Sequence, residues 1–449
     1  MFSRSGYRGV FFIAIICVLS CTSASQTEER LEGYAALCAR GVAFEDASDL
    51  DSLIALCSGS RLVLLGESTH GTSEYYRWRA EISKRLVVEQ GFRFIAVEAD
   101  WMPMYRLNLY VKWLLDEEGV TAASILRGFS RWPEWMWGNT EVEALAEWLR
   151  EHNRLLPVDE RVGIYGMDVY GQWEAMDEVL AVVSALIPDE EAKVREHYGC
   201  FTRFGRDEWR YAQAVTQGLA SCDHRLHEVV HLLKSRWEAA ESEEEERLLF
   251  HGMQSAKVVL NAEDFYRLSA QGDNNGSWNS RATHMHHTTG RLLKRYGEEA
   301  RGIVWAHNTH IGDARATSMA VEGRVNIGQL SRELYGESSI TGIGFTTYTG
   351  RVNAGSRWGA PMSIMDIPRA AEGSLEYLLN KCGLQQFFVV FDQELENDEV
   401  LNNQIGHRAI GVVYNPATER RFNYVPTVLT QRYDALVFFH ATKELEPVK

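Results

Sequence analysis

Short apolar runs that each lead to a polar side chain constrain the fold of this 449-residue chain more than any other feature. Near-continuous apolar runs of this length indicate strands that are buried on both faces of a sheet. Four such runs precede residue 307, at residues 61–65, 92–97, 162–167 and 302–306. Four more predicted strands follow, at residues 340–348, 386–391, 409–414 and 435–439.

Helical patterns separate the strand-like runs. Residues 73–90 have apolar and charged side chains on different sides of a helix, and residues 140–153 follow a helix cap at Asn139 or Thr140. Strands that alternate with helices predict an α/β fold, with a mainly parallel central sheet flanked by helices.

The strand pattern disappears between residues 169 and 293. This stretch is predicted to be a helical insertion that forms a cap or wall of the active-site cleft. Residues 30–168 and 294–449 are then predicted to form the α/β core around it.

The N-terminus has the pattern of an export signal, predicted over residues 1–20. Basic residues precede an apolar run at residues 10–20, which is shorter than the roughly 20 residues of a spanning helix. The run ends in Val18-Leu19-Ser20-Cys21, which resembles a bacterial lipobox, with residues 21–29 as a tether. We therefore expect an exported bacterial protein, periplasmic or anchored to the outer membrane by a lipid on Cys21. An ordinary cleaved signal with a chance cysteine is the alternative.

Charge and cysteine content limit the partners and the cross-links. A net charge of −16 excludes nucleic acid as a partner, because phosphates require a basic face. Five cysteines remain beyond the two of the N-terminal segment, and an odd number cannot all pair within one chain. An oxidising compartment permits Cys200–Cys222 or Cys38–Cys57, although spacing alone establishes neither.

Polar groups at the ends of the predicted strands are the first candidates for a functional site. Open α/β sheets bind ligands in the crevice at the carboxyl ends of their strands. The groups at these ends are Glu67, Glu98, Asp168 and His307. His70 lies in a turn bounded by two glycines, and the helix after it turns its N-terminal amides toward the same region.

His70 is predicted to be the base that activates a water molecule. Glu67 could orient the imidazole, and Arg79 on the following helix could supply a positive charge for an anionic intermediate. Ser68 is disfavoured as a nucleophile, because a nucleophile elbow requires glycine at the position that His70 occupies. A capping or turn role is predicted for Ser68 instead.

Other histidines and a tryptophan-rich segment are further candidates. His307 and His310 could act as electrophile or leaving-group acid, or could join His70, Glu67 and Glu98 as metal ligands. The main hypothesis requires no cofactor, and a bound metal is the alternative. The remaining histidine groups, predicted on exposed helix faces, are His224, His227 and His231, and His284, His286 and His287. Residues 131–139 contain tryptophans that either line an apolar pocket or anchor the loop in the core.

The sequence around these candidates resembles that of the erythromycin esterases. The resemblance runs through almost the whole chain after the signal, as short segments in a constant order. These segments are residues 64–72, Glu98-Ala99-Asp100-Trp101, residues 135–142, residues 165–170, Trp278-Asn279-Ser280-Arg281, residues 306–314, residues 326–330 and Tyr433-Asp434-Ala435. One departure is Ala282, where the family commonly has Asp after the Arg of its Trp-Asn-x-Arg segment, and it alters the local wall of the pocket.

The resemblance implies hydrolysis of a macrolactone ester without a covalent enzyme intermediate. Its general base corresponds to His70, its supporting glutamates to Glu67 and Glu98, its arginine to Arg79 and its second histidine to His310. The residues predicted to contact the ester, a small molecule such as erythromycin, are His307, Trp101, Trp135, Trp137, Asp168 and Arg281. Two alternatives remain: a metal-dependent hydrolase of another ester or amide, and a non-catalytic lipoprotein that binds heme or another small molecule.

Overall fold

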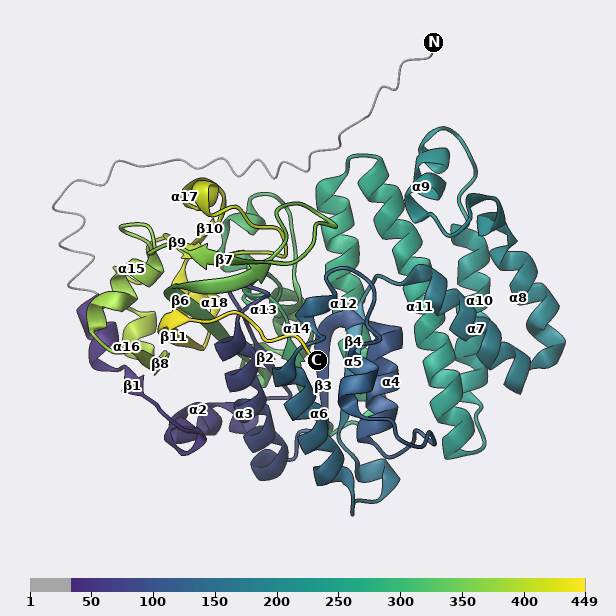
Figure 1. Cartoon of the computed structure of the whole chain (residues 1–449), viewed down its shortest axis with the longest axis horizontal. Coiled ribbons are helices and arrows are strands. Elements are labelled where there is room, and N and C mark those ends of the chain that lie inside the picture. The colour runs from purple at the N-terminus through teal and green to yellow at the C-terminus, as the bar shows by residue number, and fades with distance from the viewer. Residues whose placement is uncertain (1–33, 449) are drawn as a thin grey trace, which may run out of the picture.

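The computed structural model describes residues 34–448 and has a central sheet of mostly parallel strands flanked by helices (Figure 1). Within these residues the main sheet has nine strands, in the order β1-β8-β11-β6-β2-β5-β3-β4, with β7 paired to β6. The strands are β1 (Val42–Ala43), β2 (Leu62–Leu65), β3 (Phe94–Asp100), β4 (Gly163–Asp168), β5 (Gly302–Trp305), β6 (Ile340–Ala354), β7 (Ser363–Ile367), β8 (Gln386–Val390) and β11 (Ala435–Thr442). The strands from β11 to β4 are parallel, whereas β8 is antiparallel to β11. The predicted α/β class is confirmed.

Helices cover both faces of the sheet, which explains the unbroken apolar runs. In β2, Leu62 and Leu64 belong to one buried core, while Val63 and Leu65 belong to the core on the other face. The Val63 side is covered by α2 (Asp51–Leu56), α3 (Ser73–Gln90), α5 (Ala122–Leu126) and α6 (Thr140–Asn153), and α4 (Trp101–Val111) contributes to both cores. A strand that is buried on both sides needs no polar positions.

The two helices predicted between the early strands form with the predicted bounds. They are α3 and α6. Asn139 is the N-cap of α6, because its side chain accepts a hydrogen bond from the backbone N–H of Val142 at 2.8 Å. α3 ends at Gly91, whose φ of 69° is in the left-handed region that favours glycine.

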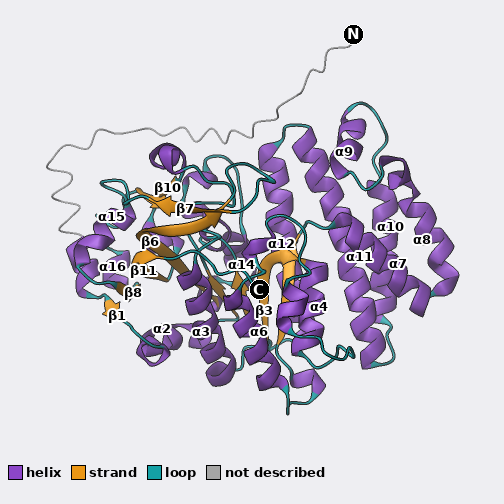
Figure 2. Cartoon of the chain, viewed as in Figure 1, coloured by secondary structure: helices purple, strands orange, loops and turns teal. Residues whose placement is uncertain are grey.

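Between β4 and β5 the chain forms helices throughout, over residues that the structure describes completely. These helices are α7 (Gln172–Leu186), α8 (Glu191–Tyr198), α9 (Glu208–Thr216), α10 (Asp223–Glu238), α11 (Glu243–Ala270) and α12 (Asn274–Tyr296). Figure 2 shows α7 to α11 as a purely helical region beside the sheet. α12 returns to the sheet, where the ring of Tyr296 stacks on Phe94 at 5.5 Å. The division of the chain into a core and an insertion stays a prediction.

Two disulfide bonds cross-link the described chain. Cys200 pairs with Cys222, one of the bonds that the spacing permitted. Cys38 pairs with Cys382, which lies 344 residues away, so the alternative bond to Cys57 is wrong. Cys57 is a buried free thiol, and burial raises its pKa to about 12.

The strand predicted at residues 409–414 is wrong. These described residues form only isolated bridges, at Ile410 and Val413, to two separate segments. The strand lies just before them, as β9 (Ile405–Arg408), which pairs with β10 (Tyr424–Thr427) in a small second sheet. The remaining short helices are α13 (Asn308–Ile311), α14 (Ile327–Tyr335), α15 (Leu375–Leu379), α16 (Gln393–Glu396), α17 (Glu419–Phe422) and α18 (Leu429–Arg432).

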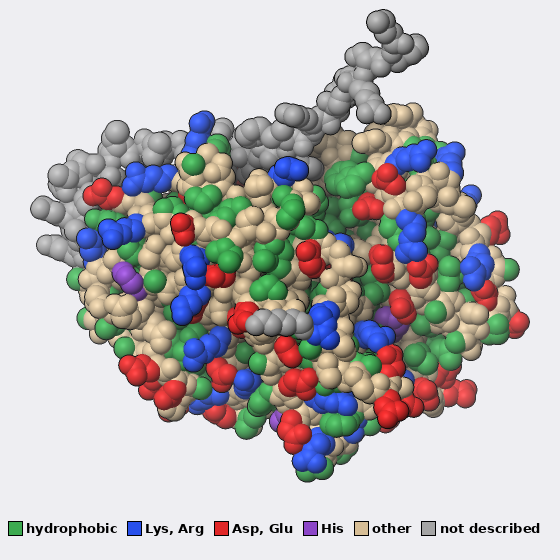
Figure 3. Space-filling model, viewed as in Figure 1, with side chains coloured by type: hydrophobic (Ala, Val, Ile, Leu, Met, Phe, Trp, Pro, Cys, Tyr) green, Lys and Arg blue, Asp and Glu red, His purple; other side chains and the backbone are tan. Residues whose placement is uncertain are grey.

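The predicted signal peptide, tether and lipid site at Cys21 lie outside the described residues. Among residues 34–448, no helix combines the length and the apolar character that crossing a bilayer requires. Figure 3 shows Asp and Glu side chains interspersed with Lys and Arg over one face of the molecule, in keeping with the acidic net charge.

Candidate active site

Four adjacent parallel strands bring their polar groups to one edge of the sheet. The strands β2, β5, β3 and β4 are neighbours in that order. At their carboxyl ends lie Glu67, His307, Glu98 and Asp168, each at most 6% exposed. Because the carboxyl ends of parallel strands meet at one edge, groups that are far apart in the sequence converge there.

Glu67 connects His70 to Arg79. Its Oε1 lies 2.9 Å from Nδ1 of His70, and its Oε2 accepts a hydrogen bond from Nη2 of Arg79 at 2.7 Å. The guanidinium of Arg79 lies 4.4 Å from the ring centre of Tyr76 and 4.7 Å from that of Trp305. The carboxylate thus fixes the Nδ1 side of the imidazole and leaves the Nε2 side available.

His70 keeps one ring nitrogen unpaired. Its side chain is 10% exposed, and within the described residues no hydrogen bond to its Nε2 forms. Its ring centre lies 4.9 Å from that of His307. Burial alone would lower the pKa of His70, but the hydrogen bond to Glu67 and the charges of Glu98 and Glu67 raise it overall. His70 is therefore more basic than an ordinary histidine.

Arg281 on α12 binds the other two carboxylates. Its Nε and Nη2 donate to the two oxygens of Asp168 at 2.8 and 2.6 Å, and Nη2 also donates to Glu98 at 2.7 Å. Burial would raise the pKa of Asp168, but the charge and hydrogen bonds of Arg281 lower it overall. The Arg281 side chain is 15% exposed, so it is not completely closed off from solvent.

His310 lies beside Arg281 as a neutral imidazole. Its Nε2 is 3.2 Å from Nη1 of Arg281, and its ring stacks on Trp278 at 4.6 Å. Burial lowers the pKa of His310 to about 4. Since Nε2 accepts from the guanidinium, the proton is assigned to Nδ1. Nδ1 is buried and has no hydrogen-bond partner among residues 34–448.

Glu98 was predicted to hold the His70 imidazole, but in the structure it does not. It binds Arg281 through Oε1, and its Oε2 accepts the backbone N–H of His307 at 2.9 Å. Burial would raise the pKa of Glu98, but the charges of His310 and Arg281 lower it. Glu98 therefore acts on His70 only through its charge.

Arg79 does not occupy the position that its predicted role requires. A cation that stabilises an anionic intermediate has to contact it. The side chain of Arg79 is completely buried behind Glu67. Arg281, predicted only as a substrate contact, binds two of these carboxylates with a side chain that is 15% exposed.

The three tryptophans predicted to contact substrate are core residues. Trp101, Trp135 and Trp137 are at most 6% exposed. The indole N–H of Trp101 donates to His251 at 3.0 Å, and that of Trp137 donates to the carbonyl of Glu98 at 3.1 Å. For these tryptophans the anchoring interpretation is correct, because packing has turned them inward.

Ser68 and the other histidines are distributed as follows. Ser68 is buried and shares a hydrogen bond of 2.8 Å with the hydroxyl of Tyr75, in keeping with a structural role in the turn.

His224, His227 and His231 are exposed on α10, as predicted. His284 and His286 are buried, so their predicted exposure is wrong, and burial lowers their pKa values to about 3 and about 4.

Asn308 shapes the site although the sequence did not single it out. Its Nδ2 donates to the carbonyl of Phe345 at 2.8 Å. Its Oδ1 lies 2.0 Å from the point that a Cβ at position 66 would occupy, so only glycine fits there. The signal was the position of Asn308 between two candidate histidines, but spacing alone does not show that it packs against Gly66.

The five side chains weighed as metal ligands do not converge on one point. Glu67 faces His70 and Arg79, whereas Glu98 faces Arg281. Among the described residues, no three His, Cys, Asp or Glu side chains are grouped so that they could hold a metal ion. A metal ion shared by Glu98, Asp168 and His310 would have to lie where the guanidinium of Arg281 lies.

The chain is similar to known proteins over most of its length. The curated "Erythromycin esterase type II" of Escherichia coli is 21% identical over 382 residues, which are 80% of this chain and 88% of that protein. A solved succinoglycan biosynthesis protein is 20% identical, with 95% of this chain and 100% of that one covered and a TM-score of 0.74. A Bacillus cereus protein is 18% identical, with 94% and 99% covered and a TM-score of 0.75. A mutant erythromycin esterase, solved in its open conformation, is 17% identical, with 90% and 97% covered and a TM-score of 0.65.

These structural likenesses establish the fold, and a family model establishes the family. The model, described as erythromycin esterase, matches residues 87–442. The matched range includes Glu98, Asp168, Arg281 and His310, and it begins after Glu67 and His70. With most of its length matched by that model, the chain belongs to the erythromycin esterase family.

Proposed function

We propose that this protein hydrolyses an ester with a water molecule that His70 activates. The observation that carries the proposal is the 2.9 Å contact between Glu67 and Nδ1 of His70, with Nε2 left unpaired among the described residues. This pairing fixes the tautomer in which Nε2 is the basic atom. Glu67 also stabilises the imidazolium that forms when Nε2 takes a proton from water.

The charges around His70 favour this proton transfer. Three carboxylates, of Glu67, Glu98 and Asp168, surround the site together with two guanidinium groups, of Arg79 and Arg281. The sum is a net charge of −1 while His70 is neutral, and proton uptake by His70 brings it to zero. The raised pKa of His70 agrees with this balance.

Arg281 and His310 can then stabilise the negative charge that develops on the ester carbonyl. The guanidinium has five N–H donors, and its contacts to Asp168, Glu98 and His310 leave one of them over. The neutral His310 holds this guanidinium through its Nε2, which lies 3.2 Å from Nη1. Donors aimed at a developing oxyanion in a site of low water content are a large contribution to catalysis.

The ester that we propose is a macrolide lactone, such as that of erythromycin. Support comes from the family of the chain and from its similarity to a protein named erythromycin esterase type II. A small-molecule ester is the class that the family implies, and the macrolide is the finer proposal.

The test replaces His70 with Asn and follows erythromycin by mass spectrometry. The parent protein should add the mass of one water to the substrate, and His70→Asn should slow this about 10²–10⁴-fold without changing the circular dichroism spectrum. His227→Asn, on the exposed face of α10, is the matched control and should keep the parent rate. An unchanged rate in His70→Asn would refute the role of His70.

Dialysis against a strong chelator separates this mechanism from the metal-dependent alternative. The water mechanism proposed above should survive the treatment. Loss of activity that zinc restores would favour the metal hydrolase instead.

We also propose that the protein is exported and carries a lipid on Cys21. The apolar run and the lipobox-like segment at its end support this. Cell fractionation and intact-mass measurement of the parent and of Cys21→Ser test it. The parent should be in the membrane fraction with added lipid mass, and Cys21→Ser should lose both. Cytoplasmic location of the parent would contradict export.

A further inference from the structure

Two tryptophans, of which one is exposed and the other is half-buried, pack together on segments that contact the candidate active site. Trp358 is 62% exposed, and its ring centre lies 4.7 Å from that of Trp132 at an interplanar angle of 59°. The indole N–H of Trp132 donates to the carbonyl of Ala360 at 2.8 Å, which fixes the pair in place. Single exposed apolar residues need no explanation, but two large rings held together in this way form a small apolar surface.

The pair is tied to the β3 side of the site. Arg131, the residue before Trp132, binds both carboxylate oxygens of Asp100. Asp100 comes two residues after Glu98, at the end of β3. In the same segment, the indole of Trp137 holds the backbone carbonyl of Glu98 at 3.1 Å. The segment that carries Trp132 therefore also contacts the strand end that carries Glu98.

The pair is also tied to the His70 side of the site. Gly71, next to His70, accepts a hydrogen bond from the backbone N–H of Asn353 at 3.1 Å. Two residues later, Gly355 lies against the ring of Trp132, whose nearest carbon is 2.9 Å from the point that a Cβ at position 355 would occupy. The tryptophan pair is thus linked through neighbouring residues both to the strand end of Glu98 and to the turn of His70.

A third ring connects the pair to Arg281. The guanidinium of Arg281 lies 5.2 Å from the ring centre of Tyr170, and that of Arg131 lies 4.6 Å from the same ring. Arg281, Tyr170 and Arg131 therefore form a row that ends at the chain neighbour of Trp132. A ligand that contacts Arg281 and extends along this row would meet Trp132 and Trp358.

We propose that Trp132 and Trp358 bind the apolar part of the substrate, away from the bond that is cleaved. This proposal rests on the proposed ester hydrolysis and narrows its substrate class to large esters with an apolar ring face. Aromatic rings offer a rigid apolar contact surface with little loss of conformational entropy, and they prefer offset or edge contacts to other groups. Small acyl esters lack such an apolar face, so we expect the pair to contribute nothing to their binding.

The experiment compares a large ester with a small one in matched tryptophan variants. Trp358→Ala should raise KM for erythromycin about 10-fold with little change in kcat, and should leave hydrolysis of phenyl acetate unchanged. Trp358→Phe should restore most of the loss. Trp113→Ala removes another exposed indole (42% exposed), at the C-terminal end of α4, and should change neither substrate. An equal effect of Trp358→Ala on both esters, or none on either, would overturn the proposal.

A binding measurement separates this inference from the proposed chemistry. Erythromycin is titrated into His70→Asn protein with and without Trp358→Ala, and binding is followed by equilibrium dialysis. About 10-fold weaker binding in the double variant supports the tryptophan pair even if the parent hydrolyses no ester. Equal binding by the two proteins would contradict the pair even where turnover depends on His70.

Discussion

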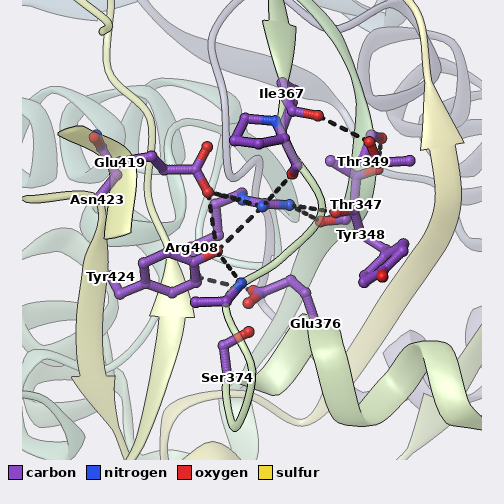
Figure 4. Close-up of polar contacts among 12 residues, drawn as sticks. Thr347, Tyr348, Thr349, Ile367, Ser374, Glu376, Arg408, Glu419, Asn423 and Tyr424 are labelled. Atoms are coloured by element: carbon purple, nitrogen blue, oxygen red, sulfur yellow. Dashed lines mark hydrogen bonds and ion pairs between the residues drawn. The ribbon is translucent and has the colours of Figure 1, made fainter. Parts of the chain in front are cut away.

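Two buried charge networks in this molecule contain similar residue types but differ in how fully their polar groups are hydrogen-bonded. The first surrounds His70 and contains Glu67, Glu98, Asp168 and Arg281. The second, which we call the Arg408 network, contains Arg408 of β9 with Glu419, Glu376 and Tyr424 (Figure 4). His407, also in β9, joins it through Glu376. Both bury carboxylates beside guanidinium groups, which is costly unless every group is paired.

The Arg408 network uses all five N–H donors of its guanidinium. Glu419 accepts from Nε at 3.0 Å and from Nη2 at 2.8 Å, and Nη2 is also 2.9 Å from the carbonyl of Pro368. Nη1 donates to the backbone carbonyls of Thr347 and Tyr348. Figure 4 shows these bonds radiating from Arg408 to three separate segments. The side chain is fully buried, so no donor is left for a ligand.

The site network leaves donors and acceptors unused. Within residues 34–448, Nε2 of His70 and Nδ1 of His310 form no hydrogen bond. The side chain of Arg281, which is 15% exposed, lies beside them. In the Arg408 network the guanidinium is saturated and Oε2 of Glu376 is unpaired but buried, whereas in the site network the unpaired Nε2 belongs to a side chain that is 10% exposed. The comparison teaches that a saturated buried guanidinium accompanies a structural role, whereas an unpaired basic nitrogen on a partly exposed side chain accompanies chemistry.

Removing Arg408 should give the largest effect on stability. In Arg408→Met, Glu419 remains buried without its cation, and the free energy of unfolding should fall by about 3–5 kcal/mol in urea denaturation. The specific activity of the protein that still folds should be unchanged. The control is Arg351→Met, which breaks an ion pair with Glu444 from a side chain that is 50% exposed and should cost at most about 1 kcal/mol. Equal costs for the two variants would contradict the structural role.

Changing Arg281 should affect activity far more than stability. Lys keeps the charge between Glu98 and Asp168 but cannot contact both carboxylates and His310 with a fixed fork of donors. Arg281→Lys should therefore lower kcat about 10²–10³-fold while the urea midpoint changes little. Arg267→Lys, which alters a similar contact to Glu263 and Asp264 on α11, should keep the parent kcat. Equal kcat losses in both variants would contradict the difference in role between the site network and a structural ion-pair network.

The sequence predicted the strand ends of the site network because burial on both sheet faces leaves a clear apolar run. Glu67, Glu98, Asp168 and His307 were found in this way. The choice between Arg79 and Arg281 could not be made, because it depends on which side of each helix faces solvent at one edge of the sheet. Proximity to His70 in the chain favoured Arg79, which packing has buried.

The Arg408 network could not be predicted, because its members come from segments that are far apart in the sequence. No local sequence pattern marks these segments as neighbours. β9 is short, and the apolar residues after it bond to three different segments: Ala409 to Asn423, Ile410 to Ser68, and Tyr414 to Gly355. An apolar run predicts burial but not a single pairing partner. The bond between Cys38 and Cys382 could not be predicted for the same reason, since no spacing rule relates positions 344 residues apart.

The contribution of Glu67 to the basicity of His70 should appear in the pH dependence of hydrolysis. The base must be neutral, so kcat/KM of the parent should fall as the pH drops through a pKa above 6.5, the value from which the pKa of His70 is raised. In Glu67→Gln the carboxylate charge is lost, and this acid limb should move to lower pH. An acid limb that stays in place would show that another group titrates.

Ser68→Ala is the smallest change and separates the site network from a serine hydrolase mechanism. Ser68 is adjacent to the charged residue Glu67, yet its hydroxyl is buried against Tyr75 at 2.8 Å. Loss of this hydrogen bond should lower the free energy of unfolding by about 1 kcal/mol. The rate of ester hydrolysis should stay within about two-fold of the parent, because no covalent step passes through the hydroxyl. A rate loss comparable to that of His70→Asn, with the urea midpoint preserved, would mean that Ser68 attacks the ester and that His70 serves it rather than water.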